Sequence, residues 1–330
     1  MFKFAISQFR DFEFLKSLYM RPVTATTAFS RLARQVQGRR WASKLTTASE
    51  DELKHFNALA STWWDVNGPQ RILHKMNLLR MDFIVDTIRT NLQLNSKDTP
   101  EEESIYIPPY NLDLLPRPIR LRIVDEQELK RDELLDESKL KILDVGCGGG
   151  ILAESMARLK YVDHVKGIDL SPDVIEAAKL HMKKDPILRD QGKLSYELQA
   201  IEDVKDTEKY HVITMFEMLE HVKYPAQVLS AAMDHLEVGG WLFLSTINRD
   251  PISWFTTIFM GEHVLRIVPV GTHNVEKYIN EYEISDWVKT NRPDFVVTDS
   301  KGCIYLPAYG WKFTETALVG NYFMAIRRVK

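Results

Sequence analysis

The stretch Ile142-Leu143-Asp144-Val145-Gly146-Cys147-Gly148-Gly149-Gly150 decides the fold of this chain. It begins as a short apolar run, which is typical of a buried β-strand. The glycines then allow a tight turn in which the backbone comes close to a ligand, because a side chain at those positions would clash with it. A helical pattern, Ile151–Leu159, follows directly. The stretch therefore predicts a strand, a ligand-binding turn and a helix.

Strand and helix patterns continue to alternate after this turn. The expected strands lie at Lys141–Val145, Val165–Leu170, Leu194–Gln199, Tyr210–Phe216, Trp241–Thr246, Phe295–Val297 and Tyr322–Ile326, and the further expected helices at Asp173–Lys184, Pro225–Leu236 and Glu281–Thr290. Gly239-Gly240 is expected to end the helix that starts at Pro225. Strict alternation predicts an α/β fold with a doubly wound, mostly parallel sheet that binds ligands at the carboxyl ends of its strands.

Residues 1–48 differ in charge from the rest of the chain. They hold nine Lys and Arg against Asp11 and Glu13, a net of +7, whereas residues 49–330 carry a net of −10. A basic segment rich in Arg, Ser, Thr and Ala is typical of a mitochondrial transit peptide. An untargeted basic tail or a nuclear signal is the alternative. Because residues 49–330 carry a net negative charge, they lack the positive surface that nucleic-acid binding needs. We therefore expect no nucleic-acid partner.

Two further segments precede the glycine turn. Residues 49–92 contain helical patterns around Leu53–Trp64 and Ile72–Ile84, and we expect an N-terminal helical cap there. The pair Trp63-Trp64 fits either the core or a wall of the substrate site. Residues 93–138 hold five prolines and many charges, which indicates an exposed insertion with a local helix near its end. Residues 139–330 form the expected catalytic domain.

The cysteine content and the apolar runs exclude two other classes of protein. Cys147 and Cys303 are the only cysteines, so neither a disulfide framework nor a thiolate metal cluster is expected. No apolar run reaches the roughly 18–20 residues that a membrane-spanning helix requires. A soluble or peripheral protein is expected.

The glycine turn is compatible with two cofactors. Asp169 ends the next strand, where its carboxylate can accept hydrogen bonds from both ribose hydroxyls of a nucleoside. Gly148–Ala153 formally matches the NAD pattern, so an NAD-dependent oxidoreductase stays open. Asp144, however, suits a cofactor with a cationic amino-acid moiety and without a pyrophosphate. This favours S-adenosylmethionine.

Several motifs together resemble one family of class I methyltransferases. They are Trp63-Trp64-Asp65, Asn77-Leu78-Leu79-Arg80, the glycine turn with Ile151–Ser155, Phe216-Glu217-Met218-Leu219-Glu220-His221-Val222, Ser245–Arg249 and Gly271-Thr272-His273. In this order they resemble the ubiquinone-biosynthesis O-methyltransferases, most closely the fungal mitochondrial members. The resemblance covers residues 50–90 and 140–330. It implies a seven-stranded class I methyltransferase sheet with an N-terminal helical extension.

The resemblance also implies a reaction and a set of cofactor contacts. The family methylates a phenolic oxygen of polyprenylated catechols, first a dihydroxybenzoate and later a demethylubiquinol. By resemblance, Arg80 contacts the cofactor carboxylate, Gly146 and Gly148 line the pocket, Asp169 binds the ribose and Phe216 lies at the adenine. His211 stands where relatives often have Asp, and no role is assigned to it.

A phenol needs help to lose its proton before it can accept a methyl group. With a pKa near 10, it is ionised to about one part in a thousand at pH 7. Glu217, Glu220 and His221 lie at i, i+3 and i+4, so one helical turn would carry them on one side as metal ligands. The resemblance implies Mg²⁺, although Zn²⁺ or Mn²⁺ would also suit. Alternatively the three form a solvated face, or His221 is a lone base. Glu217 and His221 are the expected catalytic residues.

An apolar segment after the fifth expected strand indicates where the protein contacts the prenyl tail of its substrate. Aromatic and aliphatic residues crowd positions 254–268, interrupted by charges, which suits an interfacial helix or hairpin. We expect a peripheral protein on the matrix side of the mitochondrial inner membrane, with a multi-enzyme complex as partner. A buried lid is the alternative for the segment. A non-catalytic scaffold that docks through Gln93–Ser138 is the alternative for the whole chain.

Overall fold

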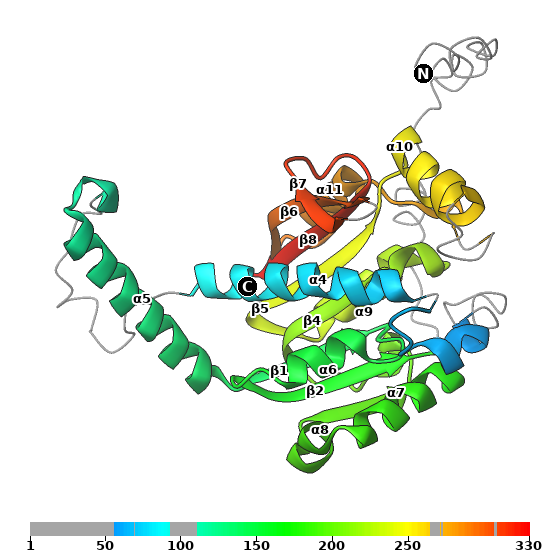
Figure 1. Cartoon of the computed structure of the whole chain (residues 1–330), viewed down its shortest axis with the longest axis horizontal. Coiled ribbons are helices and arrows are strands. Elements are labelled where there is room, and N and C mark those ends of the chain that lie inside the picture. The colour runs from blue at the N-terminus through cyan, green and yellow to red at the C-terminus, as the bar shows by residue number, and fades with distance from the viewer. Residues whose placement is uncertain (1–55, 69, 93–110, 265–270, 272, 307–308) are drawn as a thin grey trace, which may run out of the picture. The chain divides into compact units, whose positions relative to one another are not determined.

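The computed structural model describes residues 56–68, 70–92, 111–264, 271, 273–306 and 309–330. The predicted targeting segment, residues 1–48, lies outside the described residues. Within the described ranges, eight strands form one sheet in the order β3-β2-β1-β4-β5-β8-β6-β7 (Figure 1). The strands are β1 Leu140–Val145, β2 Val162–Asp169, β3 Leu194–Leu198, β4 Tyr210–Phe216, β5 Leu236–Ile247, β6 Phe295–Leu306, β7 Gly310–Thr314 and β8 Asn321–Arg328.

The sheet is doubly wound and mostly parallel, as predicted. Strands β3, β2, β1, β4 and β5 run parallel, whereas β8, β6 and β7 pair in antiparallel fashion. The predicted number of seven strands was wrong. The additional strand, β7, has five residues and pairs only with β6 at the edge of the sheet, so its short and partly exposed pattern carries little signal.

Helices cover both faces of the sheet. Those that contact its strands are α4 Arg71–Thr90, α6 Ile151–Ala157, α7 Pro172–Lys184, α8 Pro186–Gln191, α9 Pro225–Asp234 and α11 Glu281–Asn291. Two further helices are α5 Arg117–Ser138, which extends away from the sheet in Figure 1, and α10 Pro251–Ser253. The crossovers through α6 and α7 lead one way along the sheet and the crossover through α9 leads the other way, which places them on opposite faces. Figure 1 shows α4 crossing in front of the sheet, where it contacts α6 and β7.

The N-terminal extension is helical where the structure describes it. Residues 56–59 are helical and lead into a 3₁₀ turn, η1 (Ala60–Thr62), and then into α4. The start of the first predicted helix, residues 49–55, lies outside the described residues. The predicted local helix near the end of the insertion is α5, in which Leu135 is the buried residue. Arg89 of α4 holds this helix through ion pairs to Glu128 and Asp132.

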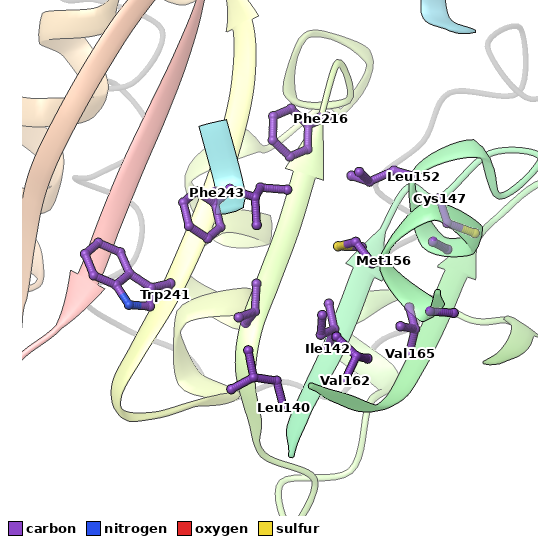
Figure 2. Close-up of a cluster of buried hydrophobic side chains, with 14 of the residues drawn as sticks. Leu140, Ile142, Cys147, Leu152, Met156, Val162, Val165, Phe216, Trp241 and Phe243 are labelled. Atoms are coloured by element: carbon purple, nitrogen blue, oxygen red, sulfur yellow. The ribbon is translucent and has the colours of Figure 1, made fainter. Parts of the chain in front are cut away.

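The core lies between the sheet and its helices. Ile142 of β1 and Val165 of β2 pack with Met156 of α6, and all three are at most 2% exposed. Figure 2 shows these side chains together, with Phe216 at the carboxyl end of β4 and Leu140 at the opposite end of the cluster. Burial of such side chains contributes roughly 1.5–3 kcal/mol each. The core therefore fixes the strand ends that carry the site.

One predicted boundary after β4 was wrong. The helix from Pro225 ends at Asp234, and Gly239-Gly240 lies inside β5 rather than at the helix end. A Cβ on Gly240 would lie 2.9 Å from the carbonyl oxygen of His211, so the two strands approach too closely there for a side chain. The pairing register of β4 and β5 shifts at this point.

None of the described helices combines the length and the apolar character that crossing a bilayer requires.

Candidate active site

The carboxyl ends of β1, β2, β3 and β4 surround one cavity. Its lining comprises Phe56, Trp63, Leu73, Arg80, residues 144–148, Ile151, Leu152, residues 168–170, Val174, residues 199–202, residues 216–218, His221, Val222 and Val228. All five predicted cofactor residues, Arg80, Gly146, Gly148, Asp169 and Phe216, belong to this lining. Ligands bind at this edge of doubly wound sheets. The cavity is therefore the candidate active site.

Asp169 ties the end of β2 to the glycine turn. Its Oδ2 accepts a hydrogen bond from the N–H of Gly148 at 3.0 Å, and its Oδ1 accepts one from Ser171 at 2.9 Å. Gly148 has a φ of +53°, and a Cβ there would lie 2.3 Å from the ring of Trp63, so only glycine fits. Burial raises the pKa of Asp169, and the backbone N–H groups oppose that rise. The turn and the carboxylate form one rigid unit.

Two buried side chains of opposite charge, Arg80 and Asp144, line the cavity with unsatisfied atoms. Thr214 donates a hydrogen bond to Oδ1 of Asp144 at 2.7 Å, whereas Oδ2 has no hydrogen-bond partner among the described residues. Nε of Arg80 likewise has no hydrogen-bond partner among the described residues. Nη2 of the same side chain lies 3.6 Å from the sulfur of Met76.

Burial perturbs the pKa values of both groups. It raises the pKa of Asp144 to about 6 and lowers that of Arg80. The two charges stabilise each other, but a buried polar atom without a hydrogen bond is unfavourable. The amino-acid end of S-adenosylmethionine would satisfy both, because its ammonium group suits Asp144 and its carboxylate suits Arg80. The cavity thus fits the predicted cofactor.

The chain turns sharply where β4 ends. The ring centroid of Phe216 lies 5.2 Å from the guanidinium carbon of Arg80, so this residue is within reach of the cofactor site. Glu217 follows with a φ of +52°, a left-handed conformation that costs a non-glycine residue roughly 1–2 kcal/mol. Ser245 of β5 offsets this strain, because its hydroxyl donates to Oε1 of Glu217 at 2.6 Å and its carbonyl accepts from the Glu217 N–H at 3.2 Å. The Glu217 carboxylate is thereby fixed at the cavity.

The predicted grouping of Glu217, Glu220 and His221 on one helical turn was wrong. The turn is a 3₁₀ helix, Leu219–His221, that begins only after Glu217, so the spacing of an α-helix does not apply. Glu217 and His221 line the cofactor cavity, whereas Glu220 and His221 line a second cavity that also contains His273. In the described ranges, no three His, Cys, Asp or Glu side chains are arranged to hold a metal ion.

Glu220 is the most buried acid at this turn, with 4% of its surface exposed. The hydroxyl of Thr246 donates to its Oε2 at 2.8 Å. Burial and the nearby charge of Glu217 raise the pKa of Glu220 to about 7, while His221 opposes the rise. Two mutually repelling carboxylates and an imidazole are donor types that suit a divalent cation. The donor chemistry fits a metal, but the described arrangement does not bring the three together.

One wall of the cavity, residues 199–202, was not predicted from the sequence. Residues 199–202, which follow β3, line it beside Asp169, and β2 and β3 pair in register up to Asp169 and Leu198. The rule that ligands bind at strand ends could have indicated these residues, because the strand was predicted to end at Gln199.

The N-terminal extension forms a second wall. Trp63 is 7% exposed, and its ring packs against Gly148 and Gly149. Trp64 lies outside the cavity lining, and its Nε1 donates to the carbonyl of Gly149 at 2.8 Å. Of the two alternatives for this pair, Trp63 is therefore a cavity wall and Trp64 an anchor on the glycine turn.

His211 has a structural contact at the other end of the strands. Its Nδ1 accepts a hydrogen bond from the backbone N–H of Lys141 at 3.0 Å, which joins β4 to β1. The carboxyl ends of these strands, not this end, line the cavity.

The apolar segment after β5 is a π-helix, Trp254–Val264. Trp254, Phe255 and Phe259 are 46, 48 and 42% exposed, which contradicts a fully buried lid. The buried Glu262 anchors the helix, because it accepts hydrogen bonds from the N–H of Gly271 and from the ring of His273. The predicted apolar residues Leu265, Ile267 and Val268 lie outside the described residues.

Comparison with known proteins identifies relatives along nearly the whole chain. Residues 119–291 match a family model described as a methyltransferase domain. The chain is 61% identical over 324 residues to the mitochondrial ubiquinone biosynthesis O-methyltransferase of Candida albicans, with 96% of either chain covered. It is 50% identical over 320 residues to the protein of that name from Saccharomyces cerevisiae, with 96% of this chain and 98% of the relative covered. Identity to the Schizosaccharomyces pombe protein is 34% over 315 residues, covering 94% and 96%.

These similarities extend over the cap, the glycine turn and the acidic turn after β4, and they confirm the resemblance drawn from the motifs. The chain belongs to the ubiquinone biosynthesis O-methyltransferase family.

Proposed function

We propose that this protein transfers a methyl group from S-adenosylmethionine to a phenolic oxygen of polyprenylated catechols, namely a dihydroxybenzoate and a demethylubiquinol, in ubiquinone biosynthesis. The observation that carries the proposal is the pair of buried, oppositely charged side chains Arg80 and Asp144, each with one polar atom that lacks a hydrogen-bond partner, in a cavity that Asp169 and Glu217 also line. Arg80 and Asp144 match the amino-acid end of S-adenosylmethionine, and Asp169 matches its ribose. Glu217 lies next to them, where β4 ends.

The cofactor half of the cavity binds and orients the methyl donor. Asp169, already fixed by the Gly148 N–H, receives the ribose hydroxyls, while Arg80 and Asp144 hold the amino-acid end. A pyrophosphate beside the carboxylate of Asp144 would place like charges together in a buried site, which disfavours NAD. Holding the sulfonium methyl in line with the acceptor oxygen supplies much of the rate acceleration through orientation.

The reaction half provides the proton acceptor. Glu217 and His221 both line the cavity, and one of them accepts the phenolic proton as the oxygen attacks the methyl carbon. The carbon–sulfur bond breaks and its electron pair stays on sulfur, which leaves S-adenosylhomocysteine. Phe216 and Met218 supply apolar surface that excludes water from the reacting groups.

A divalent cation, with Mg²⁺ as first choice, is a further part of the proposal. Glu217 and His221 would hold it, with Glu220 as a third ligand only if the turn rearranges. When bound, it would favour the ionised catechol as a Lewis acid. Titrating Mg²⁺ into the purified protein by calorimetry is the test. Heat that disappears in Glu217→Gln supports the cation, whereas no heat, together with full activity in a strong chelator, would eliminate it.

A methyl-transfer assay on a short-tailed catechol tests the enzyme itself. Purified protein should form the monomethylated catechol and S-adenosylhomocysteine in equal amounts. S-adenosylmethionine should bind in calorimetry and NAD should not. A protein that binds S-adenosylmethionine without product would be a scaffold instead, and NAD binding alone would indicate the oxidoreductase.

The location at the matrix face of the mitochondrial inner membrane is likewise proposed. The relatives from Candida albicans and Saccharomyces cerevisiae are named mitochondrial, and the exposed rings of Trp254, Phe255 and Phe259 suit the boundary of a bilayer. Triple replacement of these residues by Ser should reduce liposome flotation of the protein while leaving activity on a short-tailed catechol. Undiminished flotation would reject the helix as the contact.

Helix α5 is the proposed contact with other enzymes of a biosynthetic complex. Leu121 and Leu129 of this helix are 48 and 63% exposed, although Glu128 of the same helix forms an ion pair with Arg89 of α4. Replacing both by Glu should abolish co-migration with partner enzymes of the pathway while activity of the isolated protein persists. Persistent co-migration would reject this helix as the docking element.

A further inference from the structure

Trp64 of the N-terminal extension is held between two histidine rings. Its ring stacks on His181 of α7, with centroids 3.4 Å apart and planes 4° from parallel. His74 of α4 meets it edge-on at 5.5 Å. Together with the hydrogen bond from Trp64 to the carbonyl of Gly149, these contacts leave its indole little freedom to move. We call Trp64, His181 and Glu154 the latch.

Glu154 completes the latch from α6. Its Oε1 lies 2.8 Å from Nδ1 of His181, and its side chain is 2% exposed. Arg158 lies 3.5 Å from the other carboxylate oxygen. Because α6 begins directly after the glycine turn and α7 begins just beyond Asp169, the latch joins the extension to both helices that follow the cofactor-binding strand ends.

The latch acts on the cavity through the neighbouring residue. His74 contacts the carbonyl of Trp63 at 2.9 Å from one side, and the clamped Trp64 restrains it from the other. The Trp63 ring packs against Gly148 and Gly149 and lines the cavity. Neither Trp64 nor His181 lines the cavity. Displacement of the latch would therefore move a cavity wall without touching the cofactor site itself.

We propose that His181 is a positioning residue that, by stacking on Trp64, keeps the Trp63 wall closed over the nucleoside cofactor and so sets how fast S-adenosylhomocysteine leaves. The inference rests on the proposed function, since it takes the cavity to be the cofactor site. The relevant contact is the aromatic stack, and the hydrogen bond to Glu154 orients the imidazole. An aromatic pair of this kind contributes about 0.5–1.5 kcal/mol, which corresponds to roughly a 2- to 12-fold change in affinity.

Calorimetric titration of S-adenosylhomocysteine and stopped-flow release of it test the inference on the full chain. His181→Ala should raise Kd about 2- to 12-fold and speed release by a similar factor. The KM for S-adenosylmethionine should rise in step, while kcat at saturation should not fall. His181→Phe keeps a stacking ring and should recover most of the affinity. His181→Gln keeps only the hydrogen bond and should resemble Ala.

His164→Ala is the matched control. His164 is a partly exposed histidine of β2 that contacts the hydroxyl of Ser195 at 2.9 Å and does not line the cavity. Its loss should leave Kd and release unchanged. Unaltered Kd and release in His181→Ala, no recovery in His181→Phe, or equal effects in the control would each overturn the positioning role. If the wild-type protein binds no S-adenosylmethionine at all, it is the proposed function that fails.

Discussion

The two halves of the cavity satisfy their charges in different ways. In the cofactor half, Arg80 and Asp144 are buried with atoms that have no partner among the described residues. In the reaction half, Glu217 already accepts a hydrogen bond from Ser245 of β5, and Glu220, which lines the second cavity beyond it, accepts one from Thr246. The first half therefore offers one free acceptor atom and one free donor atom to a ligand, which matches the charges at the amino-acid end of S-adenosylmethionine. The second half is completed by the protein and reveals only where a proton can be held.

If the halves are separable, removing Glu217 of the reaction half together with the neighbouring acid Glu220 should leave cofactor binding intact. Glu217→Gln with Glu220→Gln should lower kcat on a short-tailed catechol by about 10³-fold, in the range expected for loss of a positioned base. Both amides can still accept from the hydroxyls of β5, so the fold should persist. The Kd for S-adenosylmethionine should stay within about twofold.

Glu237→Gln, an exposed acid on β5, is the control for that double replacement and should change neither quantity. An equal loss of cofactor affinity and of kcat would mean that the two halves do not act separately.

The buried carboxylate of Asp144 in the cofactor half should lower the free energy of unfolding, and this can be measured. The pKa of Asp144 is about 6 in the folded protein, above its ordinary value of 3.8. The folded state therefore binds the proton more tightly, so stability falls as pH rises between these two values, by about 3 kcal/mol in total. Asp144→Asn avoids this loss and keeps the acceptor for Thr214. The variant should unfold at higher urea than the wild type at pH 8, with the gap closing toward pH 4.

Added S-adenosylmethionine should reverse that ranking at pH 8, because only the wild type keeps the carboxylate that we propose for the ammonium group of the cofactor. Asp163→Asn, an exposed residue of β2, serves as the control. If Asp144→Asn is less stable than the wild type at pH 8, Asp144 has a partner in the ligand-free protein and the contrast between the halves fails.

The sequence could predict those residues of the cavity that belong to one local pattern, but not those that the fold brings together from distant segments. Gly146, Gly148 and Asp169 were predicted because the strand–glycine–helix pattern and a strand-end acid are local features. Arg80 came only from the resemblance, since its helix precedes the glycine turn by some sixty residues of sequence. The latch could not be predicted either, because it joins Trp64, Glu154 and His181 from three separate elements.

The error at the acidic turn has a different cause. Spacing of i, i+3 and i+4 places residues together only if the segment is an α-helix, and Glu217 instead adopts a left-handed conformation before a 3₁₀ turn. That conformation is held by hydrogen bonds with Ser245, 28 residues away, whose hydroxyl accepts from the Glu217 N–H and donates to the Glu217 carboxylate. A tertiary contact thus decided the local geometry, which a pattern confined to seven residues could not show.

Arg80 allows the cofactor half to be tested by affinity alone. Arg80→Met keeps an apolar stem beside Phe216 and removes the charge that we propose binds the cofactor carboxylate. A charge-assisted hydrogen bond of about 2 kcal/mol corresponds to roughly a 30-fold rise in Kd for S-adenosylmethionine. Arg89→Met is the matched control on the same helix, since Arg89 pairs with Glu128 and Asp132 of α5. Similar affinities in the two variants would remove Arg80 from the site.

The smallest effect is expected at the opposite ends of the same strands. His211 of β4 accepts the N–H of Lys141 at 3.0 Å, far from the carboxyl edge that lines the cavity. His211→Ala should cost about 1 kcal/mol of unfolding free energy, the worth of one hydrogen bond, and leave Kd and kcat unchanged. His211→Asp restores an acceptor and should recover most of that loss in urea denaturation. A change in Kd here would show that the strands transmit strain along their length, and then neither half of the cavity could be treated as a rigid frame.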